Sequence, residues 1–390
     1  GETHLVILGT SDMHGNVWSY SYEDNAETAN NGMPRLYTYI QQVRAENPIT
    51  FLVDAGDDIQ GTILTDDLAN KNPDAPHPVI AVMNFMGYDA MALGNHEFNW
   101  GVPNMLKMLS TAEFPVLGQN VLTADGEYVT GHGWTIIERE GIKLAVIGVC
   151  TPNIPIWDGG KEGIDDLTYE AASSAVKKAI AEIGDQADII MVSAHMGMFA
   201  EFDEDGGSDS AQKILDDNPK VDVLQVAHMH ITVNEKQGNV VIGGVRSSGR
   251  EIARFDLTLD ADKNIIDSAV TIVDMADIEP SAEIREIPLV KELHEKTIAF
   301  VQGGGSGENG EEGEPLGVTT AKFQPENEIL GLPEGKLRDT AVIDLILNIQ
   351  LANSDADVTA AALFKDTSDL PEGNINYGNI FDIYKFDNTL

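Results

Sequence analysis

The stretch Leu5-Val-Ile-Leu-Gly-Thr-Ser-Asp-Met-His-Gly-Asn16 joins a short apolar run to a polar loop that contains Asp12 and His14. Short runs rich in Val and Ile recur along the chain, and each ends in a polar turn. These runs are Leu5–Leu8, Phe51–Val53, Ala90–Leu93, Leu144–Val149, Ile189–Val192 and Val223–Val226. Runs of this length and composition predict strands that are buried on both faces.

Segments with helical periodicity lie between many of these runs. They are Leu36–Arg44, Val79–Met86, Val102–Leu109, Tyr169–Ile183 and Ala211–Leu215. Alternating strands and helices predict a layered α/β domain. In such a domain the loops that follow the strands gather at one edge of the sheet, where ligands bind. Val240–Gly244 and Glu251–Leu259 are predicted as later strands, for which an antiparallel arrangement is one option.

The remainder of the chain has a different composition. Pro280–Phe300 has one apolar face and is predicted to be a helix, whereas residues 303–314 contain no apolar residue and are typical of a flexible linker or an exposed loop. Residues 316–390 contain one clear helical pattern, Thr340–Leu351. We therefore divide the chain into a catalytic domain (1–278), a helical linker with a Gly/Glu-rich loop (279–315) and a partial C-terminal domain (316–390).

The charge of the chain limits its possible partners. The sequence has 64 Asp and Glu against 24 Lys and Arg, which gives a formal charge of −40. Such a field repels nucleic-acid backbones and anionic membrane surfaces. It also repels phosphate groups, so a bound metal is the natural source of local positive charge. We expect a small-molecule partner and no nucleic acid; the sequence gives no indication of an oligomeric state.

Cysteine usage and hydropathy narrow the class further. Cys150 is the only cysteine, which excludes an internal disulfide and a Cys-based zinc site, and its place after an apolar run predicts a buried thiol. No stretch reaches the ~18 apolar residues of a membrane span. The sequence begins with Gly1-Glu-Thr3 and lacks an initiator Met, as a processed or trimmed product would. The residues alone therefore do not indicate the cellular compartment of the protein.

Potential metal ligands follow five of the predicted strands. Five of the nine histidines fall in these loops, and Asp57 follows Gly56 in a tight turn where a carboxylate can bridge two cations. The nitrogen and oxygen donors are those that Mn, Zn, Co or Fe accept. The predicted ligands are Asp12, His14, Asp57 and His230 for one metal, and Asp57, Asn95, His195 and His228 for the other.

A pair of divalent cations about 3.5–4 Å apart suits the hydrolysis of phosphate esters, because it can activate a water as hydroxide and neutralise the phosphate oxygens. His96 follows a predicted ligand but has no necessary role in binding metal. We expect it either to stabilise the developing charge or to protonate the leaving oxygen.

These motifs, in this order, resemble those of the calcineurin-like metallophosphoesterases, and most of all the two-domain 5′-nucleotidase branch. The resemblance covers Thr3–Phe300 and, more weakly, Leu316–Leu390. It implies a four-layer α/β/β/α sandwich, a helical linker and a C-terminal α/β domain that binds a nucleotide. It also implies a secreted, periplasmic or cell-wall-associated location.

Finer details are similar to the 2′,3′-cyclic-nucleotide 2′-phosphodiesterase/3′-nucleotidase type. They are Gly56-Asp-Asp-Ile-Gln-Gly61, His77-Pro-Val79 ahead of Met83-Asn84, Gly94-Asn-His-Glu-Phe-Asn99 with Gly101, and the ending Tyr384-Lys-Phe-Asp-Asn-Thr-Leu390. Typical 5′-nucleotidases have an Asp where Asn99 stands. Asn99 can orient His96 but cannot supply a charge.

The sequence departs from the family pattern in two places. The family's Gly-His-x-His is Ala227-His-Met-His230, which keeps both donors, and the second domain stops early. In the family two aromatic residues clamp the base. Phe386 matches the first, with Tyr384 as the alternative, and no residue matches the second.

Three functions remain open on these grounds. The first is hydrolysis of 2′,3′-cyclic nucleotides and 3′-nucleotides, and the second is a 5′-nucleotidase or nucleotide-sugar hydrolase with the same metals. The third is a non-catalytic surface protein that binds nucleotide or metal. The complete set of predicted ligands, together with His96, favours an enzyme.

Overall fold

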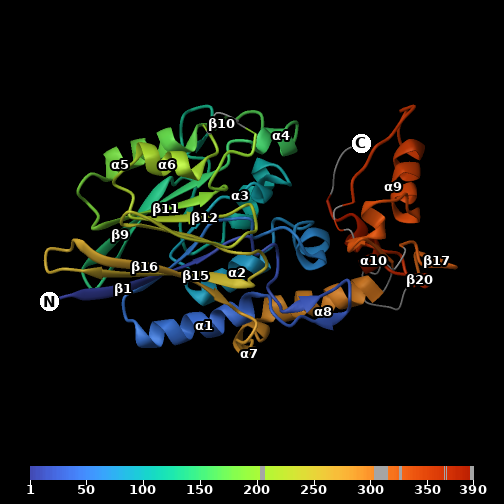
Figure 1. Ribbon diagram of the computed structural model, residues 1–390, viewed down its shortest axis with the longest axis horizontal. Helices are drawn as coiled ribbons and strands as arrows, with labels where there is room; N and C mark the ends of the chain where they lie inside the picture. The colour runs from blue at the N-terminus through green and yellow to red at the C-terminus, as the bar shows by residue number, and fades with distance from the viewer. Residues whose placement is uncertain (203–206, 303–314, 325–326, 364, 366, 387–390) are drawn as a thin grey trace. The chain divides into compact units, whose positions relative to one another are not determined.

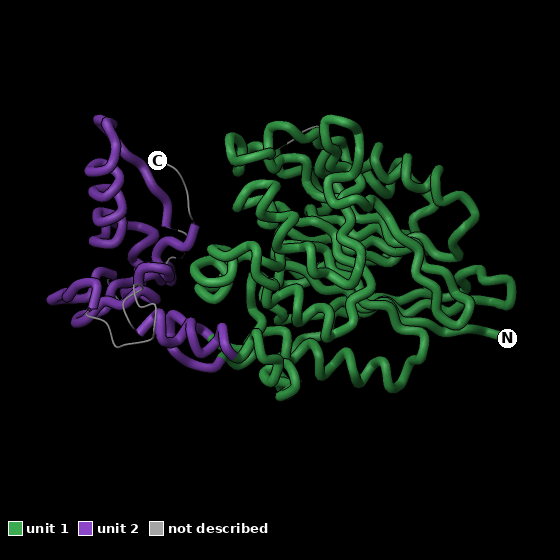
Figure 2. The backbone as a smooth tube through the Cα atoms, turned by 180° about the vertical axis from the view of Figure 1, so that it is seen from behind, with its two compact units in different colours: residues 1–20, 28–291 green, residues 21–27, 292–390 purple. Residues whose placement is uncertain are grey.

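The computed structural model describes residues 1–202, 207–302, 315–324, 327–363, 365 and 367–386. These residues form two compact units, shown in Figure 2. Unit 1 comprises residues 1–20 and 28–291, and unit 2 comprises the described residues of 21–27 and 292–390. The predicted loop at 303–314 lies outside the described residues.

The first sheet of unit 1 has six strands in the order β16-β15-β1-β4-β5-β6. Strands β1, β4, β5 and β6 are parallel, whereas β15 is antiparallel to β1 and β16 is antiparallel to β15. The bounds are β1 (Thr3–Thr10), β4 (Thr50–Asp54), β5 (Ala90–Ala92), β6 (Val116–Leu117), β15 (Glu251–Leu259) and β16 (Ile265–Asp274). The first three predicted strands are confirmed.

The second sheet also has six strands, in the order β13-β14-β12-β11-β9-β8. Strands β9, β11, β12 and β14 are parallel, and the edge strands β8 and β13 are antiparallel to their neighbours. The bounds are β8 (Trp134–Arg139), β9 (Ile142–Cys150), β11 (Ile189–His195), β12 (Val223–Val226), β13 (Val233–Gln237) and β14 (Val240–Gly244). Strand β14 is therefore parallel to β12 and antiparallel to β13. Cys150, at the end of β9, is buried as predicted.

The two sheets pack face to face, and helices cover their outer faces, which confirms the four-layer α/β/β/α fold (Figure 1). Apolar side chains from both sheets, such as Phe51, Val146 and Phe255, fill the space between them. Helices α5 (Ala172–Ile183) and α6 (Ala211–Asp217) cover the second sheet. Helices α1 (Met33–Glu46) and α2 (Pro78–Met86) lie on the side of the first sheet.

Buried polar side chains tie the two sheets together close to the carboxyl ends of their parallel strands. Gln225 on β12 donates from Nε2 to the carbonyl of Thr10 on β1 at 2.7 Å. Ser193 on β11 donates from Oγ to the carbonyl of Asp54 on β4 at 3.1 Å. These hydrogen bonds therefore keep the loops that follow the strands of one sheet close to the loops that follow the strands of the other.

Two predicted helices differ from the structure in their limits. The helix expected from Tyr169 begins at Ala172, because Thr168–Tyr169 (β10) pairs with Val121–Leu122 (β7). The helix expected over Pro280–Phe300 is divided into α7 (Ala282–Arg285) and α8 (Pro288–Gln302). Proline lacks a backbone N–H and disfavours a helical residue before it, so a new helix starts at Pro288.

The other helices of unit 1 are short. They are α3 (Val102–Leu109), α4 (Ile154–Asp158), the single 3-10 turn at His96–Phe98 and the π-helical segment Leu64–Ala69. Among the described residues, none of the helices combines the length and the apolar character that crossing a bilayer requires.

Unit 2 has its own small apolar core around Val342, Ile346 and Ile383. The helix predicted over Thr340–Leu351 is confirmed as α9. The elements that lie wholly or partly in this unit are β2 (Tyr20–Ser21), β3 (Ala26–Glu27), α8 from Glu292 onward, β17 (Gly317–Thr319), β18 (Glu328–Ile329), β19 (Leu332–Pro333), a 3-10 turn (Glu334–Lys336), α9 (Ala341–Ala352), β20 (Gly373–Ile375) and α10 (Tyr377–Ile383). The hydroxyl of Tyr22 lies 2.7 Å from Nδ1 of His294, so the early hairpin joins the C-terminal part of the chain.

Candidate metal centre

The predicted metal ligands come together at the carboxyl ends of the parallel strands. Asp12 and His14 follow β1, Asp57 follows β4, and Asn95 follows β5; these three strands belong to the first sheet. His195 ends β11, and the His228–His230 pair follows β12, in the second sheet. The expectation of a single sheet edge was wrong, because the apolar strands form two stacked sheets whose ends meet at the site.

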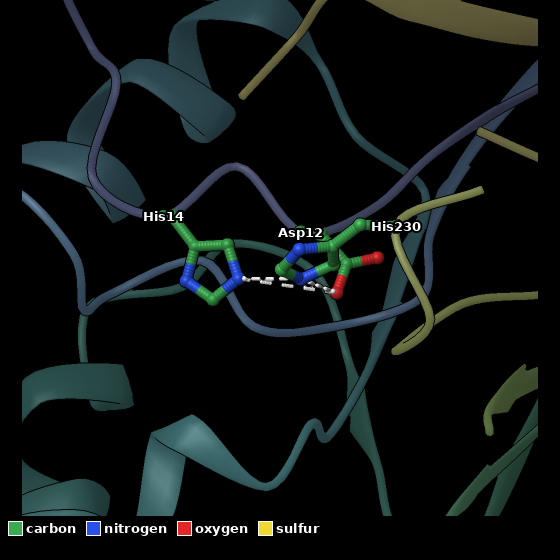
Figure 3. Close-up of side chains that lie close together, drawn as sticks. All are labelled: Asp12, His14 and His230. Atoms are coloured by element: carbon green, nitrogen blue, oxygen red, sulfur yellow. Dashed lines mark hydrogen bonds and ion pairs between the residues drawn. The ribbon is translucent and has the colours of Figure 1, made fainter. Parts of the chain in front are cut away.

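Asp12, His14 and His230 form the first cluster of possible ligands, with one ligand atom from each lying within 4.8 Å of the others. Nε2 of His230 is 3.3 Å from Oδ1 of Asp12 and 3.1 Å from Nε2 of His14. The three side chains point toward one another in Figure 3. Two imidazole nitrogens and a carboxylate oxygen that converge in this way fit a divalent transition-metal ion.

Asp57, His195 and His228 form the second cluster. Nε2 of His195 is 3.0 Å from Oδ2 of Asp57. Oδ1 of Asn95 lies 3.1 Å from Nε2 of His195 and 3.0 Å from Nδ1 of His228. The amide oxygen of Asn95 therefore adds a fourth donor to this cluster.

Asp57 connects the two clusters through one oxygen atom. Its Oδ2 lies 3.0 Å from Nε2 of His195 in the second cluster and 4.0 Å from Nε2 of His14 in the first. Its Oδ1 accepts the backbone N–H of His96 at 2.7 Å, which fixes the orientation of the carboxylate. This position fits a carboxylate that bridges two cations.

Five of these residues have a left-handed backbone, with positive φ angles that non-glycine residues seldom adopt. They are Asp12 (φ 52°), His14 (47°), Asp57 (64°), His228 (71°) and His230 (55°). The loops are tied together by backbone bonds, with Asp12 N–H donating to Gly56 O at 2.8 Å and His14 N–H to Asp57 O at 3.0 Å. Unfavourable conformations of this kind persist mainly where a site requires them.

Backbone carbonyls orient the rings of His14 and His195 from the side of each ring that faces away from the clusters. Nδ1 of His14 lies 3.0 Å from the carbonyl of Gln60, and Nδ1 of His195 lies 2.7 Å from the carbonyl of Ala55. A carbonyl only accepts, so each Nδ1–H donates, and Nε2 is the ring nitrogen that faces the cluster. Such partners set the tautomer in metal sites.

His228 is oriented in the opposite sense. Its Nε2 lies 2.7 Å from the Glu201 carboxylate, which leaves Nδ1 facing Asn95 and the second cluster. Glu201 was not recognised from the sequence, because it lies in a polar loop with no ligand pattern. The ring of Trp157 also contacts His228, with 5.6 Å between ring centroids.

Glu97 supports the loops that carry Asp57 and Asn95. The buried carboxylate accepts the backbone N–H of Gly94 at 2.7 Å, of Asp57 at 2.8 Å and of Asp58 at 2.7 Å. The loops are so close that a Cβ at Gly94 would lie 2.2 Å from Oδ1 of Asp57. The sequence motif contains Glu97, but spacing alone assigned it no role.

The charges of the site are strongly coupled. Burial opposes ionisation of Asp57, but the imidazoles of His195 and His96 outweigh it and hold the pKa of Asp57 well below its usual range. Burial opposes protonation of His195, but the Asp57 carboxylate raises the pKa of His195 to about 10. Burial lowers the pKa of His14 to about 4. The carboxylate of Asp57 is therefore ionised and attracts positive charge, as a metal ligand requires.

His96 lies beside the first cluster, with its ring centroid 5.3 Å from that of His14. Its Nδ1 is 2.8 Å from Oδ1 of Asn99. Nδ2 of Asn99 lies 3.3 Å and 3.1 Å from the two carboxylate oxygens of Asp158, and Nζ of Lys161 is 2.6 Å from Asp158. The sequence pointed to Asn99 but not to Asp158, which is 59 residues away in a segment without a recognisable motif.

The two residues predicted to stack on a base belong to unit 2. Tyr384 packs against the small core of that unit, and the Lys385 ammonium lies 5.6 Å from the ring centroid of Phe386. Their role toward a substrate stays a prediction.

Comparison with known proteins adds to this geometry. Residues 5–232 match the model of the calcineurin-like phosphoesterases, and residues 316–390 match that of the 5′-nucleotidase C-terminal domain. The chain is 28% identical to the trifunctional nucleotide phosphoesterase protein YfkN of Bacillus subtilis, over 100% of this chain and 29% of that protein. It is 26% identical to the 2′,3′-cyclic-nucleotide 2′-phosphodiesterase/3′-nucleotidase of Salmonella typhimurium, over 99% of this chain and 65% of that protein.

The chain thus spans 29% and 65% of the lengths of these two curated relatives. Among solved structures, a putative 5′-nucleotidase from Staphylococcus aureus superposes with a TM-score of 0.82 over 99% of this chain and 73% of that chain, at 22% identity. A likeness at this identity shows a shared fold.

Proposed function

The chain belongs to the calcineurin-like phosphoesterase family, and from this premise we propose that it hydrolyses phosphate esters of nucleotides with two divalent cations. The observation that carries the proposal is the meeting of two ligand clusters at Oδ2 of Asp57. Asp12, His14, Asp57 and His230 would hold one cation, and Asp57, Asn95, His195 and His228 the other.

When bound, the two cations would lower the pKa of a bound water, so that hydroxide is available as the nucleophile, and would supply positive charge for the phosphate oxygens. The formal charge of the chain is −40, so these cations also offset its repulsion of an anionic substrate. Asp57 stays ionised, and Glu97 fixes the backbone that carries it.

His96 is the residue of the chain that we assign to the leaving group. It lies at the rim of the first cluster and is held by Asn99 at Nδ1. Its Nε2 is then the ring atom that exchanges a proton with the leaving oxygen.

We propose 2′,3′-cyclic nucleotides and 3′-nucleotides as substrates. Support comes from Asn99 in place of the Asp typical of 5′-nucleotidases, and from relatives whose names describe this pair of activities. We further propose that the protein acts outside the cytoplasm, where such an enzyme would scavenge phosphate and nucleosides. The 5′-nucleotidase C-terminal domain match favours a 5′-nucleotidase as the second candidate.

Release of phosphate or nucleoside from 2′,3′-cyclic AMP, 3′-AMP and 5′-AMP tests the proposal. The protein is first stripped of metal and then supplied with Mn²⁺, Zn²⁺ or Co²⁺. We expect metal-dependent turnover with a preference for the first two substrates. A preference for 5′-AMP would select the second candidate, and metal-independent turnover, or none on any of the three, would contradict the main proposal.

Two variants separate metal binding from proton transfer. We expect Asp57→Ala to lose metal at both clusters, because it removes the shared carboxylate oxygen. We expect His96→Ala to keep its metals and to lower turnover by ~10²–10⁴, as for loss of a general acid. Metal content and kcat are measured on the same samples. Wild-type turnover in both variants would show that the site is placed wrongly.

A further inference from the structure

Three side chains behind His96 form a hydrogen-bonded chain that leads away from the metal clusters. The chain runs from Nδ1 of His96 to Oδ1 of Asn99 (2.8 Å), and from Nδ2 of Asn99 to Asp158 (3.1 and 3.3 Å). This series of hydrogen bonds ends at Nζ of Lys161, 2.6 Å from Oδ1 of Asp158. The side chain of Asp158 is only 2% exposed.

The direction of these hydrogen bonds follows from which groups can donate. A carboxylate only accepts and an ammonium only donates, so Lys161 donates to Asp158, and the NH₂ group of Asn99 must face Asp158 as well. The oxygen of Asn99 is thereby turned toward His96. That oxygen can only accept, so Nδ1 of His96 must carry a hydrogen.

The local sequence brings these residues together for definite reasons. His96 begins the 3-10 turn and Asn99 caps its end three residues later, so their side chains lie on the same face. Asp158 is the last residue of α4, and the loop that follows passes close to the segment after Asn99. The backbone N–H of Val102 donates to the carbonyl of Glu162 at 2.9 Å, and a Cβ at Gly101 would lie 3.0 Å from that carbonyl oxygen.

We propose that Asp158 is a positioning residue that acts through the amide of Asn99 to hold His96 in the Nδ1–H form. This inference rests on the proposed function for its catalytic consequence. The side chain of Asn99 separates the carboxylate of Asp158 from the imidazole, whereas in a direct Asp–His pair the two groups are in contact. Asp158 sets the orientation of the ring without placing a negative charge against it.

The catalytic consequence is that only Nε2 can exchange a proton with the leaving group. His96 acts in this step as the imidazolium, with a hydrogen on both ring nitrogens. As the bond between phosphorus and the leaving oxygen breaks, the proton on Nε2 moves to that oxygen, the oxygen of the attacking water forms the new bond to phosphorus, and His96 is left neutral in the Nδ1–H form. The proton released by the water then restores His96. If the amide of Asn99 turned its NH₂ group toward His96, two donors would face each other at Nδ1 of the imidazolium, and this transfer would be hindered.

An exchange of the two side chains tests the proposal. In Asp158→Asn, the new amide offers its oxygen to Lys161 and its NH₂ group to Asn99, so the amide of Asn99 can turn and His96 can shift to the Nε2–H form. Asn99→Asp places two carboxylates in contact. In the double variant Asn99→Asp/Asp158→Asn, the carboxylate now at position 99 accepts from both His96 and the amide at position 158, while Lys161 donates to the oxygen of that amide. The direction of every bond at His96 is then restored.

We expect each single variant to lower kcat on 3′-AMP about tenfold, a part of the ~10²–10⁴ that general acid catalysis contributes, with KM nearly unchanged. The double variant is expected to recover most of this loss. On 4-nitrophenyl phosphate, whose leaving group needs no proton, the changes should be small. Losses that simply add in the double variant, or that are equal on both substrates, would overturn the proposal.

Asp166→Asn is the matched control, since Asp166 is an exposed carboxylate in the same loop. It should behave as the unsubstituted protein.

A direct measurement separates this inference from the proposed function. In metal-free protein with ¹⁵N-labelled histidine, long-range ¹H–¹⁵N correlation spectra report the tautomer of each ring, and His96→Gln identifies the signals of His96. We expect the Nδ1–H form in the wild type, a shift toward Nε2–H in Asp158→Asn, and a return in the double variant. A tautomer that does not respond to Asp158→Asn would overturn the inference, whether or not the protein hydrolyses any nucleotide.

Discussion

At the scale of single residues, Glu97 stabilises the site without facing it. Its carboxylate accepts four backbone N–H groups from the loops that carry Asp57 and Asn95, the longest bond being that from Ile59 at 3.4 Å. All four donors would be left without this partner in Glu97→Ala, and a buried donor without a partner costs about 1–3 kcal/mol.

We therefore expect Glu97→Ala to lower the free energy of unfolding of the metal-free protein by about 3 kcal/mol or more. Urea denaturation measures the change. Glu113→Ala, which truncates an exposed glutamate, is the control and should change stability by no more than about 0.5 kcal/mol. Equal stability of the two variants would show that Glu97 is not needed by the loops.

The candidate ligands were predictable from the sequence because each follows an apolar run directly, as Asp57 follows Thr50–Asp54. The residues that orient them were not. Asp158, at the end of α4, meets Asn99 across 59 positions of sequence, and Glu201 meets His228 across 27. No periodicity or spacing reports such contacts.

At the scale of elements, His77 caps the start of α2 in its neutral form. Its Nδ1 accepts the backbone N–H of Val79 at 3.3 Å, and its Nε2 donates to Oδ1 of Asn70 at 2.7 Å. Burial lowers the pKa of His77 to about 3. The unfolded chain has an ordinary His pKa of about 6.5, so between these values it binds one more proton than the folded chain.

Stability from His77 is therefore complete above pH ~6.5 and is lost as the pH falls toward 3. Between pH 7 and pH 5 the loss should be about 2 kcal/mol. We expect His77→Asn, which keeps a capping oxygen but does not titrate, to lack this part of the pH dependence. This prediction is checked by measuring the free energy of unfolding of the metal-free wild type and of metal-free His77→Asn at pH 7 and pH 5. Identical pH dependence would contradict the neutral cap.

Element types were easier to predict than their limits or their partners. The strand at Ile189–Val192 and the helix at Val102–Leu109 are strongly patterned and are found. The break before Pro288 and the pairing of Thr168–Tyr169 depend on single residues. The division of the strands between two sheets depends on which apolar faces pack together, and buried strands are apolar on both faces.

At the scale of the whole molecule, the metal ligands all lie in unit 1, whereas unit 2 has a separate core. A ligand that binds only the folded form of one unit stabilises that unit, by about 2.7 kcal/mol at 100 times its Kd. We therefore expect Mn²⁺ to raise the unfolding temperature of unit 1 and a chelator to lower it.

The four tryptophans, Trp18, Trp100, Trp134 and Trp157, all belong to unit 1, so their fluorescence follows that unit alone. Far-ultraviolet circular dichroism follows both units. The Mn²⁺-dependent shift should appear in the fluorescence of the wild type and be absent from Asp57→Ala. An equal shift in that variant would show that the stabilising metal binds elsewhere.

The contact between Tyr22 and His294 joins residues that are 272 positions apart. During synthesis the ribosome releases Tyr22 long before His294. At about 5–20 residues per second the interval is roughly 15–55 s. For that time the early hairpin has no partner in its own unit, although residues on both sides of it can already begin to fold. Unit 2 can therefore be completed only after every residue of unit 1 has been synthesised.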